Sequence, residues 1–313
     1  MPFFISIMHP EEIFDELEVL VDRLPFNLPH HEDGGVVDPF AWNSSVGEFN
    51  SFNLLQANDW IKLTDANVII NQWKELEYAR RFNELSSRKA EVEAWQDGIE
   101  DLAQEVYKLT NLQAYNFSLK CDHQSPNGII IAQMQDGKWV GITSKVYVAS
   151  GIPDEVIDLS PLDRPISEIE KNRSQIAVII SQIPAIVMNG DFADYSCSHI
   201  HKMIFSTGQS RESAWENTLK ASGMLTISKF NNIYKGRDYL SEHYYCDESE
   251  EDVQDIFDRY AKIAKLLHQE LSNPIVFQIS SWISEHIYIV GQVKGMEGDK
   301  LGIYIKSNFV YNP

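Results

Sequence analysis

The sequence predicts an α/β (α+β) protein made of two tandem repeats, each with helices on both sides of a largely antiparallel sheet. Three observations lead to this prediction. First, 313 residues with 43% hydrophobic and 11% aromatic residues suffice for two domains that each bury a core. Second, each half contains a helix-forming segment followed by three strand-like runs with short connections, which is the order of an antiparallel meander. Third, the two halves match each other under one constant shift along the chain.

The first half is expected to begin with a helix at residues 10–24, where Pro10 and two acidic residues suit a helix N-terminus. Residues 25–45 carry three prolines and two glycines and predict a loop with one short strand. Residues 65–109 are helix-forming almost throughout, with breaks expected near Ser86 and Gly98. Strands are predicted at 114–121, 128–134 and 138–148, the last two joined by a tight Asp136-Gly137 turn.

Residues 151–165 contain three prolines and no sustained period, so we expect a linker there, between a first repeat at 1–150 and a second at 166–313. The second repeat is predicted to contain helices at 166–183, 211–222 and 250–271, and strands at 201–207, 275–282, 286–293 and 301–311, with 223–234 extended. The runs at 128–134 and 286–293 are apolar at most positions, which indicates that both faces of these strands are covered.

The internal match involves a helix and a hairpin in one register. The shift places Leu102, Ala103 and Val106 on Ile263, Ala264 and Leu267, and it places Gly137, Val140, Gly141, Ile142 and Lys145 on Gly298, Leu301, Gly302, Ile303 and Lys306. A duplication is therefore predicted. Within the hairpin, Gly137 is expected in the turn, and Gly141 and Gly302 are expected to mark either a strand bulge or a close approach of another part of the backbone.

The formal net charge of −20 and the pI near 4.8 argue against nucleic acid or an anionic membrane as a direct partner, because phosphate binding needs clustered Lys and Arg. Arg23 is the only Lys or Arg in residues 1–60, and a second acidic run lies at 247–258. Such runs can be solvated faces that keep a protein soluble, or they can attract a basic protein that itself binds nucleic acid. Both interpretations stay open.

The cysteines indicate a reducing compartment. Cys121, Cys197 and Cys246 are odd in number and widely spaced, so a disulfide framework is not expected and a cytoplasmic location is the prediction. The apolar start of the sequence is short and lacks a basic region, which does not fit a signal peptide. No apolar run approaches the ~20 residues that a membrane span needs.

The segment from Leu271 to Tyr311, and its counterpart ending "DGKWVGITSKVYV" in the first half, resemble the nuclease A inhibitor family. The shared features are the helix, Asn273-Pro274 before the first strand, the "YIVG" at 288–291, and a hairpin ending in G-x-x-G-I-x-x-K. The resemblance covers the last third of each half. It implies a three-layer α/β/α sandwich in each repeat and direct binding of a nuclease.

The resemblance also implies partner-binding residues. Family inhibitors carry an Asp-Trp pair ahead of their long helix, and Asp59-Trp60 holds this place in the first repeat. In the family the hairpin carries the inhibitory end, so its rim is the second candidate, with Trp139, Thr143, Ser144 and Lys145. The family's terminal Glu-Thr is replaced by Val148-Ala149 and by Phe309-Val310, so the inhibitory chemistry itself does not transfer.

Candidate catalytic and metal-binding residues are few. No GxSxG, HExxH, phosphate loop or dinucleotide fingerprint occurs. Cys197, His199 and His201 alternate and would point one way on a strand, as metal ligands do, but no second Cys/His cluster of matching spacing supplies a fourth ligand. The loop residues His30–Asp33 are another candidate for metal or acid–base chemistry. We expect no catalysis, no cofactor and no bound metal.

The expected function is that of a non-enzymatic acidic protein-binding module, which inhibits or regulates a nuclease or another nucleic-acid-processing enzyme. A structural or accessory subunit of a multiprotein assembly, without inhibitory activity, is the alternative. A metal-dependent enzyme that uses Cys197, His199 and His201 is the third hypothesis.

Overall fold

The protein is a mixed α/β protein with two antiparallel sheets. The computed structural model describes residues 8–24, 35–75, 89–117, 128–134, 136–149, 175–192, 195–231, 233, 250–280 and 284–308. The chain divides into two compact units: unit 1 consists of Met1–Asn53 and Leu225–Tyr311, and unit 2 of Leu54–Met224 with Asn312–Pro313. This division differs from the sequential repeats expected at 1–150 and 166–313, because each sheet contains strands from both halves of the chain. The expected linker, 151–165, lies outside the described residues.

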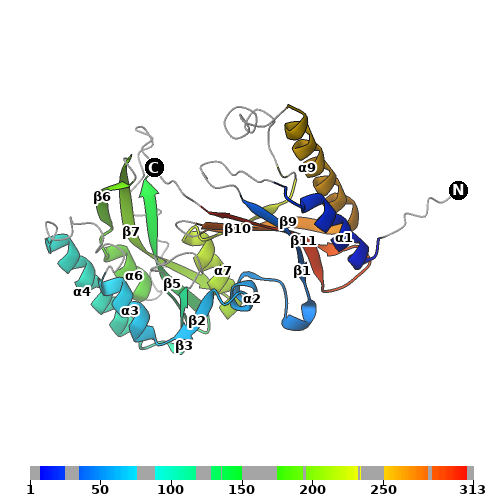
Figure 1. Ribbon diagram of the computed structural model, residues 1–313. Coiled ribbons are helices and arrows are strands. Elements are labelled where there is room, and N and C mark those ends of the chain that lie inside the picture. Colours follow the sequence, from blue (N-terminus) through cyan, green and yellow to red (C-terminus); the bar gives the residue numbers. More distant parts are fainter. Residues whose placement is uncertain are drawn as a thin grey trace. The chain divides into compact units, whose positions relative to one another are not determined.

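Unit 1 is built on a five-stranded antiparallel sheet with the strand order β1-β11-β10-β9-β8. Its strands are β1 (Val36–Trp42), β8 (Leu225–Lys229), β9 (Leu271–Ser280), β10 (Ser284–Val293) and β11 (Lys300–Asn308). Helices α1 (Pro10–Val21) and α9 (Glu250–Glu270) cover one face of this sheet (Figure 1). The short helix η1 (Ser44–Val46) and the start of α2 (Ser51–Ala57) follow β1.

The core of unit 1 forms where α1 and α9 lay their apolar sides on the sheet. Ile13 and Leu17, one helical turn apart on α1, are fully buried there. Arg259 of α9 ties the two helices together, because its guanidinium donates hydrogen bonds to the carbonyl oxygens of Leu20, at 3.0 Å, and of Asp22. These carbonyls lie at the C-terminal end of α1, where a cation also stabilises the helix dipole.

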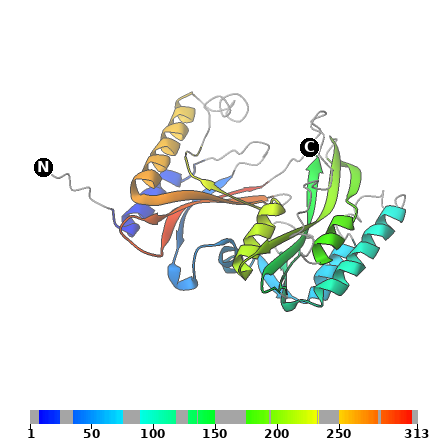
Figure 2. The same cartoon turned by 180° about the vertical axis from the view of Figure 1, so that it is seen from behind.

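Unit 2 is built on a six-stranded antiparallel sheet with the strand order β2-β3-β4-β5-β7-β6 (Figure 2). Its strands are β2 (Ile61–Thr64), β3 (Thr110–Phe117), β4 (Gly128–Gln133), β5 (Trp139–Ala149), β6 (Ile186–Phe192) and β7 (Tyr195–Gly208). Helices α3 (Ala66–Glu75), α4 (Lys89–Val106) and α6 (Gln175–Gln182) pack on one face, and α7 (Arg211–Ala221) packs on the other. None of the described helices is long and apolar enough to cross a membrane.

The predictions for the glycines inside elements have different outcomes. The predicted helix break at Gly98 does not occur, since α4 continues from Lys89 to Val106. A Cβ atom on Gly98 would lie 2.8 Å from Cγ1 of Ile183, so the glycine makes room for the segment that follows α6. At Gly141 and Gly302 the strand register runs without a shift, so the bulge alternative is wrong. The other alternative, a close backbone approach, is confirmed, because a Cβ atom would lie 1.8 Å from the Ile289 carbonyl oxygen at Gly302 and 3.0 Å from the Ala214 carbonyl oxygen at Gly141.

Register shifts occur elsewhere in the two sheets. One falls between Thr110 and Gln113 on β3, and one between Val290 and Gln292 on β10. The strand β3 begins at Thr110, four residues before the predicted start. The residues ahead of the shift on β3 do not continue the apolar pattern that follows it, so the sequence pattern did not reveal them as part of the strand.

Candidate functional site

The turn between β4 and β5 is closed by its own backbone. Gly137 has a φ of 83°, and its N–H donates to the carbonyl of Met134 at 2.9 Å. The Met134 N–H donates to the carbonyl of Lys138 at 2.8 Å, and the Lys138 N–H donates to Oδ1 of Asp136 at 3.0 Å. The Asp-Gly turn forms as predicted, and the polar groups of its residues hydrogen-bond to one another rather than to a ligand.

The candidate residues on β5 lie on both faces of the sheet. Val140 and Ile142 belong to the core under α4, and Ser144 follows them on that face with 5% of its surface exposed. Thr143 faces the side covered by α7 and is fully buried, and its hydroxyl donates to the carbonyl of Gly128 at 3.0 Å. The burial of Thr143 and Ser144 removes both from the expected partner-binding rim.

The two remaining rim residues differ from this pair. Trp139, at the start of β5, is half-buried and pairs with Gln133 and Gly208 in the sheet. Lys145 pairs through its backbone with Lys202, and its side chain lies outside the described part of the structure. Trp139 is therefore the only rim candidate whose side chain the structure describes as partly accessible.

The Asp59-Trp60 pair ends α2. Asp59 is exposed and has a φ of 57°, while Trp60 is 6% exposed and its N–H donates to the carbonyl of Leu55 at 2.8 Å. Together with the Asp59 N–H bond to Gln56, at 3.0 Å, this is a Schellman-type helix end with a left-handed residue. Asp59 thus has a local conformational role, and Trp60 is a core side chain that offers little surface to a partner.

The alternating Cys197, His199 and His201 lie on β7, which begins six residues before the strand predicted at 201–207. His201 is 3% exposed and shares its face of the sheet with Met203, a residue of the α4 core. The side chains of Cys197 and His199 lie outside the described residues, as does the segment His30–Asp33. Among the residues that the structure describes, no three His, Cys, Asp or Glu side chains come together as a metal site would need.

The sequence analysis did not predict a cluster of aromatic rings and a histidine on unit 1. It lies on the sheet face opposite α1 and α9, where Nδ1 of His286 is 2.7 Å from the Tyr304 hydroxyl and the Tyr304 ring stacks on Tyr288 at 4.7 Å. Burial, and then the charge of Lys306, lower the pKa of His286 to about 4. A neutral imidazole either accepts a hydrogen bond from the Tyr304 hydroxyl or donates one to it, depending on its tautomer. The alternation of His286 and Tyr288 with isoleucines along β10 could have placed these two side chains on one face, but the contact with Tyr304 depends on the register with β11.

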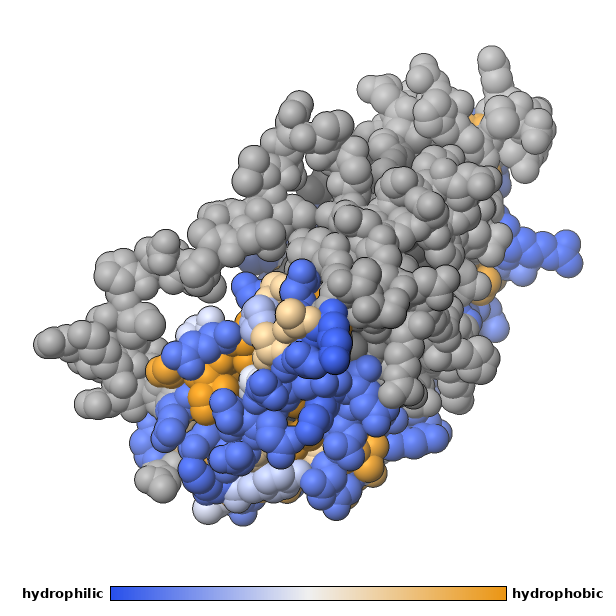
Figure 3. All heavy atoms as spheres, turned by 90° about the vertical axis from the view of Figure 1, so that its left-hand side faces the viewer, coloured by the Kyte–Doolittle hydropathy of each residue, from blue (hydrophilic) through white to orange (hydrophobic). Residues whose placement is uncertain are grey.

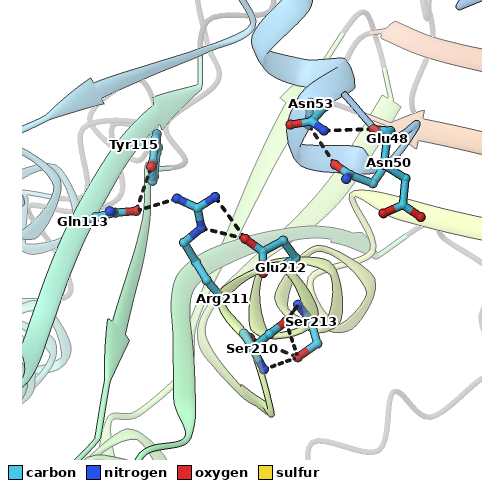
Figure 4. Close-up of polar contacts among 9 residues, drawn as sticks. All are labelled: Glu48, Asn50, Asn53, Gln113, Tyr115, Ser210, Arg211, Glu212 and Ser213. Atoms are coloured by element: carbon cyan, nitrogen blue, oxygen red, sulfur yellow. Dashed lines mark hydrogen bonds and ion pairs between the residues drawn. The ribbon is translucent and has the colours of Figure 1, made fainter. Parts of the chain in front are cut away.

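A polar cluster on unit 2 centres on Arg211, the first residue of α7 (Figure 4). Its Nε and Nη2 atoms each lie 3.0 Å from Oε1 of Glu212, and Nη1 lies 3.5 Å from Oε1 of Gln113. The Tyr115 hydroxyl donates to the same Gln113 oxygen at 2.9 Å. The pKa of the Glu212 carboxyl is lowered by its own backbone N–H and by Arg211, and burial raises the pKa of Tyr115. These contacts hold the guanidinium in one orientation.

The two units also carry acidic helices whose charges are compensated differently. On α1 the exposed acids are Glu11, Glu12, Asp15, Glu16 and Glu18, and no Lys or Arg occurs in the helix. No ion pair found within the described ranges involves α1. On α4 three of the acids are paired: Glu93 with Lys89, Glu100 with Lys74 and Glu105 with Lys108. The α1 surface is therefore the less neutralised of the two.

The face of the molecule in Figure 3 shows how the described surface is distributed between polar and apolar residues. Hydrophilic residues cover most of it, with small apolar areas between them. Exposed apolar side chains of unit 2 include Leu63 at 70%, Tyr107 at 47% and Val178 at 45%. They belong to a strand, a turn and a helix that are separate in the sequence.

In comparisons with known proteins, no family model matches the chain and no curated protein matches it.

Proposed function

We propose that the protein is a non-enzymatic, cytoplasmic binding module that inhibits or regulates a basic nuclease or another nucleic-acid-processing enzyme. The observation that carries the proposal is the uncompensated acidic surface of α1, in a chain with a formal charge of −20. A protein that binds nucleic acid presents a basic surface, and an acidic face is complementary to that surface.

The carboxylates of α1 lie close enough together to attract a cationic partner through their combined electrostatic field. Its five carboxylates lie within twelve residues, which is about 18 Å of helix at 1.5 Å per residue. At low ionic strength the Debye length exceeds the spacing of neighbouring carboxylates, so their fields add and raise the rate of encounter with a cationic partner. This mechanism depends on the absence of Lys and Arg from α1 itself, since Arg259 of α9 meets the helix only at its C-terminal end, through the carbonyl oxygens of Leu20 and Asp22.

The proposal includes a duplicated fold of the nuclease A inhibitor type, with a three-layer α/β/α arrangement in each copy. Its support is that three pairs of elements, α4 and α9, β3 and β9, and β5 and β11, begin at positions related by the shift that carries Gly141 onto Gly302. The strand β10 begins at Ser284, five residues before the position equivalent to the start of β4 at Gly128. The inhibitory surface would differ from the family's, because the Glu-Thr hairpin end is missing and two of the four rim residues are buried.

The test compares two charge-reversed variants of the full chain. Asp15→Lys with Glu18→Lys alters exposed acids of α1, and Asp97→Lys with Asp101→Lys alters two exposed acids of α4 as the matched control. Basic proteins captured from native extract at low salt are identified, and the nuclease activity of each is measured with and without added protein.

We expect the α1 variant to lose capture and inhibition at least tenfold, while the α4 variant keeps both, since the two variants change the net charge equally. Equal losses would show that only total charge matters. A captured nuclease whose rate is unchanged by the wild-type protein would contradict inhibition.

The alternative, an accessory subunit of an assembly, has one specific observation in its favour. Leu63 is 70% exposed on β2, which ends the strand order of the unit 2 sheet, and an apolar side chain on such a strand suits pairing with another chain. Native mass spectrometry separates the two functions: a permanent stoichiometric complex with full nuclease activity favours the alternative.

A further inference from the structure

Each sheet is completed by a strand from the other half of the chain. In unit 1, β1 pairs with β11 over seven residues, from Val36 opposite Lys306 to Trp42 opposite Lys300. In unit 2, β5 pairs with β7 over eleven residues, from Trp139 opposite Gly208 to Ala149 opposite Ser198. Both pairings cross the segment 151–165 that the sequence predicts as a linker.

The two sheets have the same order once the strands are matched by position. From the edge inwards, β8-β9-β10-β11 corresponds to β2-β3-β4-β5, and the next strand is β1 in unit 1 and β7 in unit 2. The pairings agree in register as well: Lys229 lies opposite Ile275, and Thr64 lies opposite Ala114, the residue that the repeat shift carries onto Ile275. The phenylalanine Phe40 lies opposite Gly302 where Ser206 lies opposite Gly141.

The turns that lead into the edge strands are also equivalent. After α2, the Trp60 N–H donates to the carbonyl of Leu55 at 2.8 Å, around Asp59 with a φ of 57°. After α7, the Met224 N–H donates to the carbonyl of Leu219 at 3.0 Å, around a glycine with a φ of 75°. A helix, a left-handed residue and an edge strand therefore follow each other in the same way near two of the unit boundaries, Asn53–Leu54 and Met224–Leu225.

From these equivalences we infer that the two halves of the chain exchange their first segments. The helix and strand α1-β1 of the first half complete the sheet of the second half, and α6-β6-β7 of the second half complete the sheet of the first. In a sequential arrangement β1 would instead pair with β5, and β7 with β11. The protein is thus a covalently joined, segment-exchanged dimer of one fold, and neither half contains a whole unit. This inference rests on the duplicated fold that the proposed function includes, and it does not depend on inhibition or on a protein partner.

The exchange has a direct mechanical consequence. Separating the halves would break both the β1–β11 and the β5–β7 pairings and would expose core side chains such as Val37, Ile305 and Ile142. Burial of such side chains stabilises the paired sheets, so the halves stay together without a covalent link. A cut between them should therefore leave one particle.

Two cysteine variants of the full-length protein distinguish the arrangements. Val36→Cys with Lys306→Cys joins positions that are opposite each other in the exchanged register. Val36→Cys with Lys145→Cys is the matched control, because Lys145 holds in the first half the position that Lys306 holds in the second. After oxidation of the monomeric fraction, peptide mass mapping should find the 36–306 link nearly complete and the 36–145 link absent. The reverse result, or the absence of both links, overturns the exchange.

A cleavage experiment measures the same arrangement independently. A protease recognition sequence inserted between Asp158 and Leu159 allows the folded chain to be cut. We expect the two fragments to elute together as one 1:1 particle with the mass of the uncut chain, and to separate only in denaturant. Separate elution of two folded fragments would contradict the inference.

Discussion

The two sheets carry different layers on the face opposite their main helices. In unit 2 that face is covered by α7, which packs so closely that a Cβ atom on Gly141 would lie 1.9 Å from Oγ1 of Thr218. In unit 1 the corresponding face carries aromatic side chains, with Phe49 edge-on to Phe40, at 6.1 Å, and to Phe277, at 5.4 Å. Sheets with the same strand order thus carry either a closely packed helix or a layer of aromatic rings. The residue opposite the strand glycine differs accordingly: it is Ser206 in unit 2 and Phe40 in unit 1.

The largest expected effect concerns the anchor of α7. Trp215 is 1% exposed, stacks on Phe117 at 6.0 Å and meets Tyr115 edge-on at 5.4 Å. We expect Trp215→Ala to lower the free energy of unfolding by about 4 kcal/mol, because it leaves a large cavity under the helix. Phe49→Ala in unit 1 removes a half-buried ring and should cost about half as much. Urea unfolding measures both, and a larger loss for Phe49→Ala would contradict the comparison.

The next effect is a loss of folding stability at acidic pH, which His286 of unit 1 causes. His286 has a folded pKa of about 4 against an ordinary value near 6.5, so above pH 6.5 both states are neutral and its contribution to stability is fully present. As the pH falls from 6.5 to 4, the unfolded state takes up the proton first, and up to about 3 kcal/mol of stability is lost. Below pH 4 no further loss comes from this group.

The measurement is the difference in unfolding free energy between pH 7 and pH 4.5, for the wild type and for His286→Phe. The variant should lose less stability over this range, since its carboxylates titrate as before but the buried imidazole is gone. Equal losses in the two proteins would show that His286 titrates normally.

A smaller effect tests the close approach of α7. Gly141→Ala should cost about 2 kcal/mol, because the new methyl group meets Thr218. Adding Thr218→Ala should restore part of this loss, since it removes the nearest atom. At the equivalent Gly302 a Cβ atom would lie 1.8 Å from the backbone oxygen of Ile289, so no side-chain substitution can relieve Gly302→Ala. Chemical denaturation of the three variants checks this order, and a Thr218→Ala change without benefit would argue against it.

The smallest effect compares the two helix ends. Asp59 and Gly223 hold the same left-handed position after α2 and α7, and glycine adopts it without strain. Asp59→Gly should therefore raise the melting temperature slightly, for a gain of about 0.5–1 kcal/mol, and Gly223→Asp should lower it by a similar amount. Opposite signs are the required result in differential scanning calorimetry.

Local patterns in the sequence predicted the positions of helices and strands better than they predicted which strands pair. The helices α1 and α9 and the β4–β5 hairpin follow from spacing and turn residues, and all three form within a few residues of the prediction. Residues 36–42 carry Pro39 and read mainly as loop, yet they form β1, whose place at the end of the sheet order tolerates a residue without an N–H. The strand that β1 pairs with lies far along the chain, and periodicity holds no information on such distant pairing.

The candidate site shows the same limit. Thr143 and Ser144 look like rim residues because they are small and polar, but both are buried in a sheet whose two faces are covered by helices from distant parts of the chain. The His286–Tyr304 pair depends on the register of β10 against β11, which short-range patterns leave open. Burial and register are properties of the assembled sheets.

The pairing of β1 with β11 sets an order of events during synthesis. All the strands of unit 2 have been made once Gly208 is joined, so its sheet can form while the ribosome is still working. The strand β1 must wait for β11, which at 5–20 residues per second takes roughly 10 to 50 s. During that interval the apolar side of α1 has no sheet to cover it. The nascent chain therefore passes through a stage in which one unit is folded and the other presents an unprotected amphipathic helix, the point at which chaperones would engage it.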